Sequence, residues 1–279
     1  MLLSRQYLAR KSRIPALLVS LAALQAPRAA AESLILNPVK DATLFQDSVD
    51  FASGVASFIF AGPIASGSPR RALLEFDVSG IPPGAIVTSV RLRLVVNRTA
   101  PGAGADTFSV HRVSADWGEG ASDGGTGGGG TQATAGDATW RSRFHGAPPG
   151  TPQVPWLVQG GEFAATASAS TVFSGNDAFT FGSTPLLVSD VSAWLASPGA
   201  NHGWILIGPE GDVYFQLARR LISRESPSVN DRPLLTIEYT LPPPAAVRVP
   251  MLPTTGLLLA ALSLLAVASR AIHRRITRR

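Results

Sequence analysis

Four acidic residues in and beside a glycine-rich segment could bind a metal ion. They are Asp116, Glu119, Asp123 and Asp137. Residues 118–130 contain eight glycines, and calcium takes carboxylate and carbonyl oxygens from loops of this kind. Calcium is therefore an optional cofactor here, but solvated loop acids are the interpretation that we favour. A second, earlier group of acids comprises Asp41, Asp47 and Asp50.

Two tryptophans and two arginines that follow this segment could bind a sugar. They are Trp140, Arg141, Arg143 and Trp156. Flat indole faces beside polar groups suit a sugar ring, and guanidinium groups pair with the carboxylates of uronates. The alternative, which we favour for Trp117 and Trp140, is that the indoles attach a long loop to the rest of the domain.

Catalytic motifs are missing from the sequence. It has no G-x-S-x-G elbow, no H-E-x-x-H pair and no cysteine, and its glycine-rich segment lacks the G-K-[ST] ending of a phosphate-binding loop. The 19 acidic residues would permit the carboxylate pair of a glycosidase, but nothing marks such a pair. We expect a non-catalytic protein, and a polysaccharide-cleaving enzyme is the least favoured hypothesis.

The C-terminal end of the chain has the pattern of a membrane-sorting segment. It reads V-P-M-L-P-T-T-G over residues 249–256, then is apolar over residues 257–268 apart from Ser263, and ends with several arginines. The motif residues are Val249, Pro250, Leu252, Pro253, Thr254, Thr255 and Gly256. Residues 252–272 are long enough to cross a bilayer, and the basic residues 273–279 would stay on the cytoplasmic side.

The N-terminal end of the chain, residues 1–31, predicts export. Four basic residues precede a short apolar run at residues 16–24, and small residues at 29–31 suit a signal peptidase, with cleavage after Ala31. An uncleaved anchor is the alternative. The absence of cysteine means that the exported domain is stabilised by its core and not by disulfides.

The charge of the chain is unevenly distributed. The net charge is +5, but residues 1–31 carry five basic residues, residues 248–279 carry six, and neither end has an acid. Residues 32–247 therefore hold 13 basic and 19 acidic residues, a net charge of −6. An acidic domain is a poor ligand for a polyanion such as DNA or RNA, so we expect no nucleic-acid partner.

The middle of the chain predicts an all-β domain. Residues 90–96 alternate between apolar and polar side chains, as in a strand with one buried face. Further strands are predicted at 71–78, 108–111, 203–208 and 235–239, and weaker ones at 41–46, 57–61, 178–182 and 218–223. One helix is expected at 189–195, capped by Ser189 or Asp190.

These elements predict one antiparallel, jelly-roll-like β-sandwich over residues 32–240, flanked by the signal peptide and a C-terminal transmembrane helix. Residues 118–161 form a loop insertion rich in glycine, proline and tryptophan. Residues 241–251 read as an extended, proline-rich stalk between the sandwich and the membrane.

Several motifs together resemble the DNRLRE-type, carbohydrate-binding-module-like domains. The residues that carry this resemblance are 70–84, 86–94, 111–120, 136–140, 160–163, 188–195, 202–208, 219–225 and 231–239. The C-terminal segment likewise resembles the V-P-x-x-P tails of exosortase-sorted bacterial surface proteins, and residues 252–256 also fit the L-P-x-T-G sortase signal. These resemblances imply a β-sandwich on the cell surface, with a sorting protease and a signal peptidase as partners.

Together, these patterns favour an exported module that is anchored at the membrane or cell surface. The leading hypothesis is that it binds acidic polysaccharide or contributes to the extracellular matrix. The alternative is a purely structural or adhesive surface protein without a glycan site.

Overall fold

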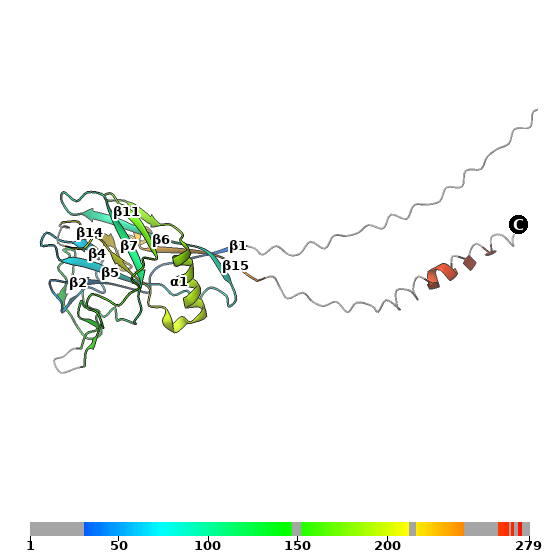
Figure 1. Cartoon of the computed structure of the whole chain (residues 1–279), viewed down its shortest axis with the longest axis horizontal. Helices are drawn as coiled ribbons and strands as arrows, with labels where there is room; N and C mark the ends of the chain where they lie inside the picture. Colours follow the sequence, from blue (N-terminus) through cyan, green and yellow to red (C-terminus); the bar gives the residue numbers. More distant parts are fainter. Residues whose placement is uncertain are drawn as a thin grey trace, which may run out of the picture.

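The computed structural model describes residues 31–146, 152–211, 216–242, 262–267, 269–270 and 273–274. Its body is an antiparallel β-sandwich with few helices, which confirms the all-β prediction (Figure 1). The main strands are β1 (Ala31–Leu36), β2 (Lys40–Phe45), β4 (Phe58–Pro63), β5 (Pro69–Glu75), β6 (Ile86–Thr99), β7 (Asp106–Arg112), β11 (Ala169–Phe173), β12 (Ala178–Phe181), β13 (Trp204–Ile207), β14 (Arg219–Ile222) and β15 (Leu234–Thr240).

The long strand β6 organises the sandwich. Val90, Leu92, Leu94 and Val96 are buried and alternate with more exposed residues, because successive side chains of a strand point to opposite faces. β15 pairs with the first half of β6, β14 pairs with its last residues, and β12 pairs along its other edge. The sheet continues through β4, β5, β13, β7 and β11, and it curls around one main core.

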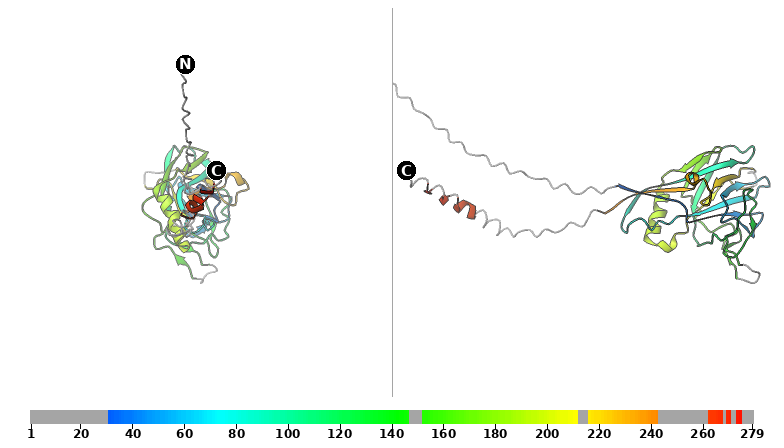
Figure 2. Two further views of the ribbon diagram at one scale, coloured as in Figure 1. Left: turned by 90° about the vertical axis from the view of Figure 1, so that its right-hand side faces the viewer. Right: turned by 180° about the vertical axis from the view of Figure 1, so that it is seen from behind.

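The two ends of the sandwich differ. Ala31 pairs with Thr240, and Thr240 also pairs with Ile86, so β1 and β15 leave the body together at what we call the stem end. Thr99 lies at the other end of β6, about 40 Å away at roughly 3.3 Å per residue, opposite Arg219. We call this the distal end, and Figures 1 and 2 show β14 and β4 there, remote from β1 and β15.

Helix α1 (Pro185–Ala196) covers the core near the stem end. The prediction of this helix is confirmed, but its predicted start and caps at Ser189 or Asp190 are wrong. The cap is Thr184, whose hydroxyl accepts a hydrogen bond from the Leu187 N–H at 3.0 Å, and Pro185 occupies the first turn. Two 3₁₀ turns, η1 (Pro198–Ala200) and η2 (Val229–Asp231), follow later.

The long segment between β7 and β11 folds against one face of the sandwich. It contains the short strands β8 (Thr131–Gln132), β9 (Ser142–Phe144) and β10 (Val154–Pro155), and β8 pairs with β3 (Phe51–Ala52). A second apolar cluster forms beneath it, and its largest members are Trp117, Trp140 and Trp156. The segment is thus fixed by buried aromatic side chains.

Most of the targeting segments lie outside the described residues. This applies to residues 1–30 of the predicted signal peptide, to residues 243–251 of the predicted stalk and to the whole sorting motif at 249–256. Ala31, at the predicted cleavage site, is the first residue of β1. Residues 262–267 are helical and exposed, and no helix within the described residues is long and apolar enough to cross a membrane.

Candidate functional site

The structure does not bring the four predicted calcium ligands together. Asp137 is fully buried and accepts hydrogen bonds from the Ala121 and Thr134 N–H groups at 2.9 and 2.5 Å, so it organises its own loop. Asp123 is exposed and accepts from a loop N–H, and Asp116 lies beside Lys40 at 3.3 Å. Only Glu119 joins a group of carboxylates, and its partners there are Asp41 and Glu225.

The second group of acids is also divided. Asp47 pairs with Arg70 at 2.9 Å, and Asp50 lies 3.5 Å from Arg141. Asp41 alone lies close to other carboxylates. Nearness in the sequence was therefore a poor guide to which acids meet in space.

The two tryptophans predicted to stack on a sugar are buried. Trp140 is 6% exposed and Trp156 is 3% exposed, and the Trp156 N–H donates to the Thr139 carbonyl at 2.9 Å. The Arg71 guanidinium lies 4.6 Å above the Trp140 ring. An indole that stacks on a sugar must expose a face, so these two side chains form no open aromatic platform in this structure.

The two arginines of that prediction are more accessible. Arg141 is exposed and lies near Asp50, whereas Arg143 is half-buried and donates to the Asp116 carbonyl at 3.1 Å. Trp117 donates its N–H to the His202 carbonyl at 3.0 Å. The tryptophans thus attach the long segment to the sandwich, which is the arrangement of the alternative interpretation.

A cationic cleft lies at the distal end of the sandwich. It has a volume of about 520 Å³, within the range of small-molecule sites, and arginines and glycines form much of its lining. The arginines are Arg70, Arg98, Arg219 and Arg220. No carboxylate is found among the described residues that line it, so its field is positive.

Arg98 and Arg220 carry the uncompensated charge of this cleft. They are direct cross-strand partners on β6 and β14, an arrangement of like charges that destabilises a sheet. Both donate to the Thr126 carbonyl, at 3.4 and 3.2 Å, and no carboxylate among the described residues pairs with either. Partial burial lowers the pKa of the Arg220 guanidinium, and the neighbouring Arg98 lowers it further.

The other two arginines are buried, whereas Arg98 is exposed and Arg220, which also donates to the Asn97 side chain at 2.9 Å, is half-buried. Arg219 is buried and donates to the Leu217 and Gly104 carbonyls. Arg70 is 3% exposed and pairs with Asp47. Arg98 and Arg220 are therefore the two guanidinium groups that a ligand in this cleft could recruit.

The glycine-rich segment forms one wall of the cleft. Gly128 has φ = +80°, and a Cβ there would lie 2.8 Å from the Phe60 ring, so only glycine permits this close approach. The Gly128 carbonyl also accepts from Arg70 at 3.1 Å. Gly128 thus lets the backbone cover Phe60 and present a carbonyl to Arg70.

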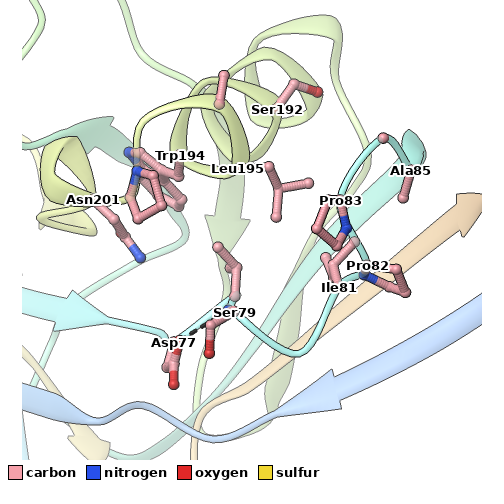
Figure 3. Close-up of a pocket in the computed structure, with 14 residues that line it drawn as sticks. Asp77, Ser79, Ile81, Pro82, Pro83, Ala85, Ser192, Trp194, Leu195 and Asn201 are labelled. Carbon is pink, nitrogen blue, oxygen red and sulfur yellow. Dashed lines mark hydrogen bonds between the residues drawn. The ribbon is translucent and has the colours of Figure 1, made fainter.

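A second cleft, of about 450 Å³, lies between helix α1 and the loop that precedes β6 (Figure 3). Its lining is mostly apolar and includes Ile81, Pro82 and Leu195. Asp77 is exposed at its edge, and the hydrogen bond from the Ser79 N–H at 2.9 Å lowers the pKa of that carboxyl. An ionised acid at the edge would repel an anion, so the distal cleft is the better candidate site.

The sequence offered a weak indication of the distal cleft. Arg98 lies two residues beyond the predicted strand 90–96, which carries Arg91 and Arg93, and Arg220 directly follows Arg219. Only the register of β6 against β14 makes Arg98 and Arg220 neighbours, and the sequence does not fix that register.

Comparison with known proteins adds no identification. No family model matches the chain, and no curated protein is significantly similar to it.

Proposed function

We propose that this chain is an exported, non-catalytic β-sandwich module that is held at the cell surface and binds an acidic polysaccharide in the distal cleft. The observation that carries this proposal is the cross-strand pair Arg98–Arg220, which has no carboxylate partner among the described residues. Guanidinium groups bind carboxylates and sulfates through paired, charge-assisted hydrogen bonds. Such a ligand would offset the repulsion between the two arginines.

The position of the cleft supports this function. In the proposal a signal peptidase removes residues 1–31, and the tail at 249–279 anchors the chain directly or through an exosortase- or sortase-like protease. The body would then adjoin the membrane through its stem end, where β15 ends. The cleft at the distal end would face the surrounding matrix, where long polysaccharides are accessible. The finer assignment to a jelly-roll, DNRLRE-like domain belongs to the same proposal.

One observation favours the alternative, a structural or adhesive module without a glycan site. The five tryptophans, Trp117, Trp140, Trp156, Trp194 and Trp204, are all buried, so none presents an aromatic face to a sugar. Binding through arginines does not require such a face, but it predicts a strong dependence on salt and on the charge of the polymer. The two functions therefore differ in a measurable property.

A binding experiment distinguishes them. The full chain, purified in detergent, is titrated with a polyuronate, a sulfated glycan and a neutral glucan at two salt concentrations. We expect binding to an acidic polymer alone, and a ten- to hundredfold loss of affinity in the double variant Arg98→Gln/Arg220→Gln, about the value of one or two charged hydrogen bonds.

Arg91→Gln is the matched control, because Arg91 is an exposed arginine of the same strand near the stem end. It should bind like the unaltered chain. Equal affinity in the double variant would reject the cleft as the site, and no binding to any polymer would favour the structural module.

A further inference from the structure

A compact group of three carboxylates lies between the long loop segment and the sandwich. It comprises Asp41 of β2, Glu119 of the segment after β7, and Glu225, which follows β14. One oxygen from each lies within 4.8 Å of the others. Two oxygens that bind the same ion, each at about 2.4 Å, can be at most about 4.8 Å apart. The spacing of the three carboxylates therefore fits ligands of a single cation.

Asp41 is the buried member of the group. It is fully buried, and its Oδ2 accepts the Arg224 N–H at 2.7 Å, whereas its Oδ1 has no hydrogen-bond partner. A buried carboxylate oxygen without a partner is costly and needs an explanation. The Asp41 carboxylate lies among the two others, where a cation would supply the missing partner.

Glu225 has the same deficiency. Both of its side-chain oxygens are buried without a hydrogen bond. Its Oε1 lies 2.7 Å from Arg224 Nε, which is an ion-pair contact whose angle is not that of a hydrogen bond. Burial raises the pKa of Asp41 and of Glu225, and the neighbouring carboxylates raise both further.

Arg224 does not neutralise the group. Its Nε and one terminal nitrogen donate to the two oxygens of Glu119, at 2.6 and 2.7 Å, and Glu119 also accepts the Asp41 N–H at 2.8 Å. The guanidinium fork thus fixes Glu119 in position. When all three are ionised, three carboxylates against one guanidinium leave two negative charges for a ligand to balance.

We propose that Asp41, Glu119 and Glu225 bind a hard divalent cation of the calcium class. The donors are all carboxylate oxygens, which suit calcium, and the group contains no histidine or cysteine that would favour zinc. The cation would link β2, the end of β14 and the long loop segment. This site is distinct from the arginine cleft, and its test uses no glycan, so the two proposals succeed or fail separately.

The test is a metal titration of the full chain in detergent after treatment with a chelator. Calcium is added while thermal unfolding is followed by circular dichroism. We expect the midpoint temperature to rise by about 5–10 °C at a hundredfold excess over the dissociation constant. Terbium serves as a second probe. Trp117 contacts Lys40, the chain neighbour of Asp41, so excitation of that indole would sensitise the ion.

Variants locate the site. Glu225→Gln should fold, because it keeps the shape of the side chain and removes a charge that burial disfavours, and it should abolish both the temperature shift and the terbium emission. Asp41→Asn should do the same, and Asp123→Asn, which changes an exposed acid of the same loop segment, should retain both. No shift and no emission in the unaltered, folded chain would overturn the proposal. So would a Glu225→Gln variant that still binds the metal.

Discussion

Replacement of Asp137 by asparagine tests how the long loop segment is held. The carboxylate belongs to that segment and is fully buried. Its Oδ1 accepts the Ala121 N–H at 2.9 Å, and its Oδ2 accepts the Thr134 N–H at 2.5 Å together with the Ser122 hydroxyl. One side chain thus joins an early part of the glycine-rich segment to the stretch that follows it.

The cost follows from this geometry. An asparagine amide has only one acceptor oxygen, so in either orientation one backbone N–H, that of Ala121 or that of Thr134, faces an NH₂ group. These donors are part-buried, and a donor left without a partner there costs about 1–3 kcal/mol, while loss of the charge weakens the remaining bonds by roughly 1 kcal/mol. We expect Asp137→Asn to lower the free energy of unfolding by about 2–4 kcal/mol, or roughly 5–15 °C in the midpoint temperature.

Urea unfolding followed by tryptophan fluorescence measures this change, because Trp117 and Trp140 lie in the cluster under the loop. Asp123→Asn is the control, since Asp123 is exposed and should change stability by no more than about 0.5 kcal/mol. The loss at Asp137 should be the same with calcium and with chelator. A loss no larger than that of the control, or one that appears only with calcium, would refute this account of the loop.

Three further changes test the core and its charges. Asp190→Ala should cost about 3 kcal/mol in urea unfolding, because the buried Trp204 N–H, now 2.9 Å from that carboxylate, loses its acceptor. Gly203→Ala should cost about 4 kcal/mol or more, since its Cβ would lie 1.9 Å from a β5 carbonyl, whereas Gly102→Ala, at a similar φ in open space, should cost about 1–2 kcal/mol. Burial raises the pKa of Glu75, so ionising this carboxyl costs more in the folded than in the unfolded chain. The midpoint temperature of Glu75→Gln should therefore rise relative to that of the unaltered chain as the pH increases from about 4 to 7. A difference between the two midpoints that stays constant with pH would contradict this.

The strands of the sandwich were predictable where one face of a strand is buried and the other is exposed to solvent. The alternation in β6 reports this directly, and the strands predicted at 203–208 and 235–239 are found as β13 and β15. β1 was missed, because its first residue belongs to a run of alanines that suits a cleavage site. β11 was missed as well, since its polar residues are small and its pattern is weak.

The candidate sites were harder to predict, because they depend on contacts between distant segments. Asp41 and Glu225 are far apart in the sequence, and they meet only because the fold places β2 beside the residues that follow β14. The burial of Trp156 was equally hidden, since a segment rich in glycine and proline has no period that reports which side faces inward. Residue types indicated calcium and arginine chemistry, and the fold decided which residues could perform it.

The two proposed sites share one structural element, and this connection makes a last prediction. Glu119 belongs to the carboxylate group, and further along the same segment the Thr126 carbonyl accepts from both Arg98 and Arg220 in the cleft. A cation that holds Glu119 would restrict the segment that forms the wall of the cleft. Because coupling between sites is typically worth about 1–3 kcal/mol, chelation should weaken binding of an acidic oligosaccharide by at least about fivefold.

The measurement compares the unaltered chain with Glu225→Gln, each titrated with a short oligouronate in calcium and in chelator at constant ionic strength. Calcium bound by the sugar itself affects both proteins equally, so only the difference between them reports the coupling. The unaltered chain should lose affinity on chelation, and the variant should bind weakly under both conditions. If chelation changes both affinities equally while the thermal shift persists in the unaltered chain, the loop is already rigid without the ion. The arginine cleft and the carboxylate group would then act independently.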